Sequence, residues 1–153
     1  MKLIIDIGNN SVKYYLFKGE NILLHSRRSS TSFDFVRELV TQYGVQSTIV
    51  SSVIELTDEQ RRQIQSSCRR VIWLGHDTPL PIKIAYDTPR TLGSDRLAAA
   101  VGAMIQAPGR DILVIDAGSA ITIDFLDKSG TFRGGNISPG IKMRLTALHK
   151  FTD

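Results

Sequence analysis

The sequence predicts a mixed α/β fold built from two related lobes, and three observations carry this prediction. Short apolar runs alternate with segments of helical periodicity, in the order three strands, helix, strand, helix, strand, connector, helix and further strands. A strand–turn–strand pattern occurs twice along the chain. The 153 residues are 42% apolar and 22% charged, which is enough apolar material for a sizeable core. Together these features predict a mixed sheet flanked by helices.

The first segment predicts a strand meander followed by a helix. Residues 2–7, 12–17 and 21–25 are apolar runs separated by GNNS and KGE. Residues 33–44 then place apolar side chains near one helical face. Ser32 is the predicted N-cap of this helix and Gly44 its predicted end.

A second strand–helix–strand segment follows. Residues 47–53 predict a strand, and residues 56–70 predict a helix in which Thr57 and Gln60 have the spacing of a capping box. The run VIWLG at residues 71–75 then predicts a short buried strand.

The middle of the chain predicts a connector and a helix of small residues. Residues 79–93 contain three prolines and predict a connector with one short strand. Residues 94–106 predict a helix capped by Ser94, with Gly109 ending the region. Its small side chains imply the close approach of another element.

The last segment predicts strands and a final helix. Strands are expected at residues 112–116, 120–126 and 131–137. Residues 138–151 predict a helix with Ser138 as cap and Pro139 in the first turn, where its missing N–H costs nothing.

An internal repeat gives these strands a chemical meaning. Residues 3–17 read LIIDIGNNSVKYYLF and residues 113–127 read LVIDAGSAITIDFLD. A glycine turn between strands exposes N–H groups that can wrap phosphates, and an Asp at the strand end can hold a cation. One D-x-G is ordinary turn chemistry, but two copies on matched strand pairs favour a nucleotide clamp. The matched pairs are Leu3/Leu113, Ile5/Ile115, Asp6/Asp116, Gly8/Gly118 and Leu16/Leu126.

This duplicated hairpin resembles the superfamily of actin, heat-shock chaperones and sugar kinases. The resemblance implies an actin-like, ribonuclease H-like fold with a phosphate-binding hairpin in each lobe. It places the first lobe at residues 1–110 and the start of the second at residues 111–153. The second lobe is expected to be incomplete, because it holds only the hairpin, one further strand and one helix.

Three segments narrow the resemblance to one family. They are DIGNNSVK (6–13), YDTPRTLGSDRLAAAVGA (86–103), and DAGSAITID with GGNISPG (116–124 and 134–140). In order and spacing they resemble type III pantothenate kinases. The resemblance implies ATP-dependent phosphorylation of pantothenate to 4′-phosphopantothenate, the first step of coenzyme A biosynthesis. A non-catalytic or regulatory relative, or an inactive fragment that keeps the ligand-binding fold, stays open as an alternative.

The resemblance assigns the nucleotide and cation sites. It implies that Asp6 binds Mg²⁺ with the ATP phosphates, that Asp116 binds a monovalent cation, K⁺ or NH₄⁺, and that Ser119 contacts ATP. Lys13 is equally compatible with a phosphate contact and with a solvated strand face. Asn10 and Ser119 stand where the family usually has Thr. The whole predicted phosphate loop is Asp6, Ile7, Gly8, Asn9, Asn10, Ser11, Val12 and Lys13.

The resemblance also assigns a pantothenate site. Asp95 would accept the proton of the substrate hydroxyl, and a helix N-terminus keeps such a carboxylate ionised. Arg96 suits the substrate carboxylate because its N–H donors come in pairs. From local sequence alone, Asp95 is a helix-start acid, Arg96 a surface ion pair and Tyr86 a half-buried connector aromatic. The full predicted set is Tyr86, Gly93, Ser94, Asp95 and Arg96.

Partners and location follow from the resemblance and the composition. The family resemblance implies a homodimer, with the small-residue helix as a candidate interface. The net charge is +4, but the arginine pairs are spread along the chain, so a nucleic-acid partner is not expected. No apolar run approaches the roughly 18 residues of a membrane helix, and the N-terminus does not resemble a signal peptide. A soluble, cytoplasmic protein is expected.

Cysteine and histidine usage predicts no zinc site and no internal disulfide. Cys68 is the single cysteine. The three histidines, His25, His76 and His149, lack metal-ligand spacing.

Overall fold

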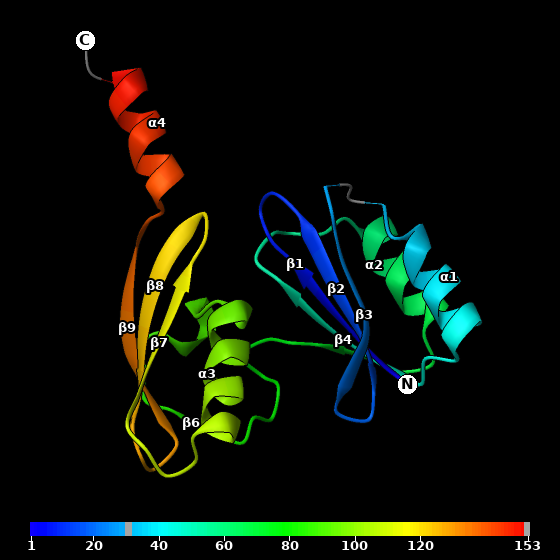
Figure 1. The fold of residues 1–153 in the computed structure, drawn as a ribbon, viewed down its shortest axis with the longest axis horizontal. Coiled ribbons are helices and arrows are strands. Elements are labelled where there is room, and N and C mark those ends of the chain that lie inside the picture. The colour runs from blue at the N-terminus through cyan, green and yellow to red at the C-terminus, as the bar shows by residue number, and fades with distance from the viewer. Residues whose placement is uncertain (30–31, 152–153) are drawn as a thin grey trace. The chain divides into compact units, whose positions relative to one another are not determined.

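The structure is a computed structural model that describes residues 1–29 and 32–151, and its elements are shown in Figure 1. The chain divides into two compact units, Met1–Thr78 and Pro79–Asp153. The connector and the small-residue helix therefore belong to the second compact unit, whereas the lobe boundary near residue 110 stays a prediction about the repeat. Across the described ranges, none of the helices has the length and apolar character needed to cross a membrane.

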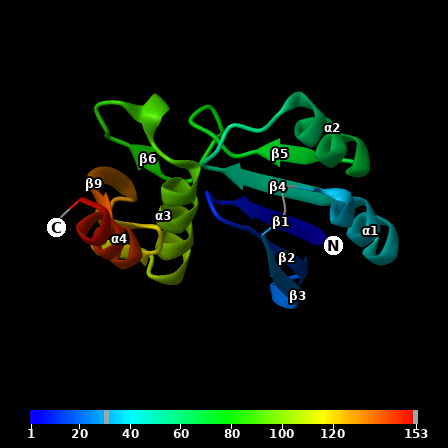
Figure 2. The same cartoon turned by 90° about the horizontal axis from the view of Figure 1, so that it is seen from above.

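Unit 1 contains a five-stranded mixed sheet in the order β3-β2-β1-β4-β5 (Figure 2). The first three strands form an antiparallel meander, while β4 lies parallel to β1 and β5 parallel to β4. The strands are β1 (Lys2–Ile7), β2 (Val12–Lys18), β3 (Asn21–Arg28), β4 (Ser47–Ser52) and β5 (Val71–Trp73). Each strand predicted in this part of the chain is confirmed, although β5 is half-buried rather than buried.

Side-chain alternation along β1 separates the core from the opposite face of the sheet. Leu3, Ile5 and Ile7 are fully buried and belong to one apolar core with side chains of α1 (Asp34–Tyr43) and α2 (Asp58–Ser67). Because successive side chains point to opposite faces of a strand, Asp6 lies on the face turned away from this core.

The two helices of unit 1 begin and end in different ways. Gly44 ends α1 in the left-handed conformation with φ 60°, as predicted, and its N–H donates to Val40. The predicted N-cap, Ser32, is wrong. The N-cap position belongs to the fully buried Phe33, and the Ser32 hydroxyl donates instead to Asp34 at 2.6 Å.

The capping box at the start of α2 is confirmed. The Gln60 N–H donates to the Thr57 hydroxyl at 3.2 Å, and the Thr57 N–H donates to the Gln60 side chain at 2.9 Å. Two of the N–H groups that a helix start leaves unpaired are thereby satisfied.

Unit 2 contains a four-stranded sheet in the order β6-β9-β8-β7. The strands β7, β8 and β9 form an antiparallel meander, and β6 lies parallel to β9. The elements are β6 (Lys83–Ile84), a 3-10 turn (Pro89–Thr91), α3 (Ser94–Gln106), β7 (Ile112–Ala117), β8 (Ala120–Leu126), β9 (Thr131–Pro139) and α4 (Ile141–Phe151).

The small-residue helix α3 packs on a sheet. Its buried residues Leu97 and Ala100 belong to one core with Leu126 and Phe132 of the second sheet. The predicted close approach is therefore present, and its partner inside unit 2 is the pair β7 and β8. The predicted cap of this helix is wrong, because Gly93 occupies the N-cap position and Ser94 is the first helical residue. Gly109 also lies beyond the helix end, which is at Gln106.

The start of the last helix also differs from the prediction. Ser138 and Pro139 are the end of β9, where they lie opposite Ile121 and Ala120 of β8. Pairing with β8 draws them into the sheet, so α4 begins at Ile141, after Gly140.

The repeated hairpins agree in topology but differ by one residue in the turn. Leu3 lies opposite Leu16 in the first hairpin, whereas Leu113 lies opposite Phe125 in the second. The second turn is shorter, so Leu126 is not the structural equivalent of Leu16, and that predicted match is wrong.

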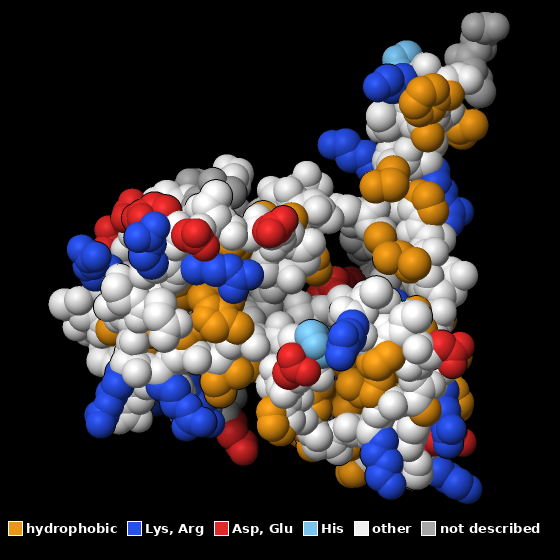
Figure 3. Space-filling view, turned by 180° about the vertical axis from the view of Figure 1, so that it is seen from behind, with side chains coloured by type: hydrophobic (Ala, Val, Ile, Leu, Met, Phe, Trp, Pro, Cys, Tyr) orange, Lys and Arg blue, Asp and Glu red, His pale blue; other side chains and the backbone are white. Residues whose placement is uncertain are grey.

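The equivalent faces of the two hairpins differ in burial. Leu3 and Ile5 are 0% exposed, but Leu113 and Ile115 are each 65% exposed. The apolar side chains of α4 are exposed as well, as Figure 3 shows. Within unit 2, the core therefore lies on the face of the sheet that contacts α3.

Replacement of Thr57 by Ala tests the capping box. We expect Thr57→Ala to lower the free energy of unfolding by about 1 kcal/mol, because the Gln60 N–H loses the hydroxyl that accepts its hydrogen bond. Urea denaturation measures this loss. The matched control is Thr41→Ala on the exposed surface of α1, where helix propensity predicts no loss of stability. An equal change in the free energy of unfolding for the two variants would contradict the role of the cap.

Candidate active site

The turn of the first hairpin displays polar groups at the end of β1. The Gly8 N–H donates to the Ser11 carbonyl at 3.0 Å and closes the turn. Asn9 and Asn10 at its tip are exposed. The predicted phosphate loop is thus a tight turn with accessible polar side chains and backbone.

A row of charged side chains crosses the sheet beside this turn. Asp6 lies opposite Lys13, and Lys13 lies opposite Arg27 of β3. The Lys13 ammonium is 3.4 Å from the Asp6 carboxylate, and both side chains are accessible to solvent. Because an accessible ion pair contributes only about 0–1 kcal/mol, a ligand can compete for either partner.

Arg27 is a member of this row that the sequence did not predict. Its Nε donates to the Ser11 hydroxyl at 2.9 Å, which holds the guanidinium against the turn. Arg28 turns to the other face and stacks on Tyr14 and Phe35, with its Cζ 5.8 and 5.0 Å from the ring centroids. From the sequence, Arg27 and Arg28 indicated only surface charge. No local pattern shows which of the two lies opposite Lys13.

The second hairpin has a different set of contacts. Asp116 is exposed and lies opposite Thr122, and the Gly118 N–H donates to the Ala120 carbonyl at 2.8 Å. The Gly140 N–H donates to the Ser119 carbonyl at 2.9 Å. A Cβ on Gly140 would lie only 2.7 Å from the same carbonyl oxygen, so glycine permits this approach.

The described residues provide single carboxylates for cations rather than a preformed cage. Within residues 1–29 and 32–151, no group of three or more His, Cys, Asp or Glu side chains is placed to hold a metal. Mg²⁺ is commonly bound by one or two carboxylates together with substrate phosphates and water. The accessible carboxylate of Asp6, next to a turn suited to phosphates, fits that kind of binding.

The predicted pantothenate site contains a buried ion pair between α3 and β8. Nε of Arg96 donates to both carboxylate oxygens of Asp124, at 3.1 and 3.0 Å, and Nη2 donates to Oδ1 as well. The side chains of Arg96 and Asp124 are only 10% and 2% exposed. Hydrogen bonding to Asp124 raises the pKa of Arg96 above its ordinary value. The ion pair expected from local sequence is thus present, but it is buried rather than on the surface.

Aromatic rings flank the guanidinium of Arg96. Its Cζ lies 5.9 Å from the ring centroid of Tyr86 and 5.8 Å from that of Phe132. The two rings meet edge to face, with centroids 6.3 Å apart. Tyr86 is half-buried, in agreement with the expectation from local sequence.

The glycine pair of β9 allows this arrangement. A Cβ on Gly134 would lie 3.3 Å from the ring of Tyr86. One on Gly135 would collide with the Ile123 carbonyl and the Asp124 carboxylate, and would lie 2.8 Å from Cα of Asp124. Local packing therefore explains the two glycines of the GGN sequence, because side chains there would leave too little room for Tyr86 and Asp124.

Asp95 lies in the first turn of α3, next to the ion pair. Its Oδ1 accepts the N–H of Arg96 at 2.8 Å. A half-buried carboxylate in this position can accept a proton from a bound hydroxyl.

The structure thus gathers part of the predicted site in each unit. In unit 2 it brings together Tyr86, Asp95 and Arg96, with Gly93 and Ser94 at the start of the same helix. In unit 1 it brings Asp6 and Lys13 to the turn of residues 8–11. Sequence reasoning missed Arg27, Phe132 and Asp124. The signal for Asp124 was present, since a charged residue interrupts the apolar pattern of its strand.

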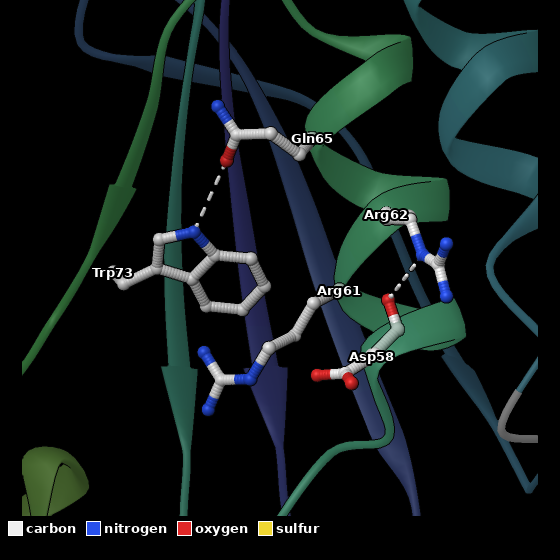
Figure 4. Close-up of a pocket in the computed structure, with 5 residues that line it drawn as sticks. All are labelled: Asp58, Arg61, Arg62, Gln65 and Trp73. Carbon is white, nitrogen blue, oxygen red and sulfur yellow. Dashed lines mark hydrogen bonds between the residues drawn. The ribbon is translucent and has the colours of Figure 1, made fainter.

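Two pockets in unit 1 lie away from the predicted site residues. The first, of about 420 Å³, is open and lies between α2 and β5 (Figure 4). There the Arg61 guanidinium stacks on Trp73 at 4.9 Å, and the indole N–H donates to Gln65 at 3.2 Å. The second, of about 440 Å³, is lined by side chains that include Ile4, Phe17 and Ile49.

Comparison with a protein-family model decides the family. The model of the type III pantothenate kinases matches residues 2–153. The chain belongs to this family. Its relatives include type III pantothenate kinases of Phocaeicola vulgatus, 46% identical over 153 residues, and of Bacteroides fragilis, 47% identical over 152 residues. That of Cytophaga hutchinsonii is 39% identical over 153 residues.

The chain spans only part of the length of the relatives it matches. The alignments cover 100%, 99% and 100% of the chain, but only 63% of each of these three relatives. The chain therefore spans less than two thirds of their length.

Solved structures agree on the fold of this pantothenate kinase family member. A Campylobacter jejuni protein assigned to the Baf family of transcriptional activators has a TM-score of 0.59 at 22% identity, covering 98% of this chain and 60% of its own. A Sinorhizobium meliloti protein assigned as a 2-dehydro-3-deoxygalactonokinase has a TM-score of 0.53 at 10% identity, covering 100% and 57%. At such identities the likeness concerns the fold alone. The predicted actin-like α/β fold, with mixed sheets flanked by helices, is confirmed.

Replacement of Gly135 by Ala tests the close packing around Asp124. We expect Gly135→Ala to lower the free energy of unfolding by about 1–3 kcal/mol, because the new methyl group overlaps a backbone carbonyl and the Asp124 carboxylate. Gly102→Ala in α3 is the matched control, since no atom lies within 4 Å of the added Cβ and helix propensity favours Ala. An equal decrease in the free energy of unfolding for both variants would refute this packing.

Proposed function

We propose that this chain carries the phosphate hairpins and the pantothenate site of a kinase that transfers the γ-phosphoryl group of ATP to pantothenate. The product is 4′-phosphopantothenate, and the reaction opens coenzyme A biosynthesis. The cluster of Tyr86, Asp95 and Arg96 around a buried ion pair, in a chain of this family, is the main support. The named activity of the longer relatives supports the same reaction.

Asp95 acts as the base in this proposal. Phosphoryl transfer depends mainly on positioning and charge neutralisation, with a carboxylate that accepts the proton of the attacking hydroxyl. The Arg96 N–H holds one oxygen of Asp95 at 2.8 Å. This contact fixes the orientation of the carboxylate.

The first hairpin binds the ATP phosphates in this proposal. Residues 7–13 would surround them with backbone N–H groups, the exposed tip and the Lys13 ammonium. Asp6 would hold Mg²⁺, which neutralises phosphate charge when bound. On the second hairpin, Asp116 would hold K⁺ or NH₄⁺ and Ser119 would contact ATP. These roles come from the family resemblance, and the accessibility of Asp6 and Asp116 supports them.

We further propose a homodimer as the working state and the cytoplasm, where ATP is made and used, as the location. Residues 1–110 and 111–153 would be the repeated lobes. The second candidate function, a non-catalytic relative that binds ligand, is favoured by Asn10 in the phosphate loop, where the family resemblance predicts Thr.

Mass-spectrometric detection of phosphopantothenate tests the proposed reaction and the role of Asp95. The chain is incubated with pantothenate, ATP, Mg²⁺ and K⁺ or NH₄⁺. Asp95→Asn is expected to lower product formation by at least about 100-fold, because the base is lost, while ATP binding persists. The matched control, Asp87→Asn, changes an exposed carboxylate of the same segment and should leave turnover unchanged. Unchanged turnover in Asp95→Asn would refute the base, and absence of product from the unmodified chain would favour the non-catalytic alternative.

Replacement of Arg27 by Ala tests whether the charged row attracts phosphates. We expect Arg27→Ala to weaken ATP binding by about 3- to 10-fold and to reduce its salt dependence, because one cation beside the turn is lost. Calorimetric titration at two salt concentrations measures both effects. Arg37→Ala, on the exposed surface of α1, removes the same charge away from the turn and should change neither. Equal weakening by the two variants would show that only net charge matters.

A further inference from the structure

Arg96 contacts Asp124 through one edge of its guanidinium. A guanidinium has five N–H donors in a planar fork, with one edge formed by Nε and Nη2 and another by Nη1 and Nη2. The hydrogen bonds to Asp124 come from Nε and Nη2. The edge formed by Nη1 and Nη2 is thereby turned away from Asp124, in a geometry that suits a second carboxylate.

The surroundings hold this guanidinium in one orientation. Tyr86 and Phe132 flank it, with ring centroids 5.9 and 5.8 Å from Cζ. Asp124 itself is 2% exposed and packs against the backbone of Gly135, so the carboxylate has little room to move. An arginine that is already ordered loses less conformational entropy when it binds a ligand.

We propose that Asp124 is a positioning residue for substrate recognition, which orients Arg96 so that its outer edge binds the carboxylate of the substrate. This inference rests on the proposed function, in which that substrate is pantothenate. Asp124 does not touch the substrate in this arrangement, and it acts through Arg96.

Two physical effects of Asp124 on a bound carboxylate oppose each other. Its negative charge reduces the attraction of Arg96 for a second anion, whereas its hydrogen bonds fix the donor geometry. A partner lost from a buried charge pair leaves the other charge uncompensated and free to rearrange. The structure favours the second effect, because the direct contacts and the aromatic flanks all act on the orientation of the guanidinium.

Binding of two ligands by the whole 153-residue chain separates positioning from general stability. Pantothenate and pantothenol differ in that an alcohol replaces the carboxylate. Calorimetric titration gives the affinity for each, and their ratio is the preference for a carboxylate. We expect Asp124→Asn to lower this preference at least 10-fold, mainly through weaker pantothenate binding, with pantothenol affinity changed less than 3-fold. Asp111→Asn, an exposed carboxylate near the start of β7, is the control and should keep the preference.

A second variant keeps the test decisive if Asp124→Asn does not fold. Phe132→Leu removes one aromatic flank of Arg96 without changing a charge, and it should lower the preference 2- to 5-fold. Circular dichroism and urea denaturation identify which variants are folded. An unchanged or increased preference in every folded variant would overturn the inference while pantothenate binding by the unmodified chain upholds the proposed site. Absence of pantothenate binding by the unmodified chain would instead overturn the proposed function, and the inference with it.

Discussion

The ion pair between Arg96 of α3 and Asp124 of β8 connects the start of α3 to the second sheet, and the local geometry of unit 2 depends on it. Burial of two charges is unfavourable unless they are paired and hydrogen-bonded, and removal of one partner typically costs about 3–5 kcal/mol. Both oxygens of Asp124 accept hydrogen bonds from Arg96, which meets that condition. The fixed position of this pair limits the residues around it, because only flat or small groups fit there. Rings lie beside the guanidinium, and glycines lie beside the carboxylate.

Strand alternation is the second constraint, and it acts in both units. In unit 1 it places apolar side chains of β1 in the core and aligns Asp6, Lys13 and Arg27 across the other face. In unit 2 the same alternation turns Asp124 inward with Leu126, and it leaves Ile123 and Phe125 outward. The same alternation therefore places a row of charged side chains on the surface of unit 1. In unit 2 it places one member of a buried ion pair in the core.

The two hairpins show how a repeated sequence takes on different environments. Their strands have the same topology, but the covering helices differ. Side chains of α1 and α2 bury the apolar face of the first hairpin. The corresponding side chains Leu113 and Ile115 remain accessible, and α4 has no buried residue. Burial is thus decided by the neighbouring elements and not by the strand sequence.

By itself, the sequence determined the α/β class, the order of the elements, the paired hairpins and the family. Hydrophobic period, glycine turns and the capping box of Thr57 act over a few residues, so they can be read locally. The tertiary structure decided the cap of α1, the strand assignment of Ser138 and the register that separates Leu16 from Leu126. It alone showed that Arg96 is paired with Asp124 and that Arg27 lies at the turn of residues 8–11, because those contacts join residues 28 and 16 positions apart. Such pairings depend on the packing of elements that are distant along the chain, which no local pattern specifies.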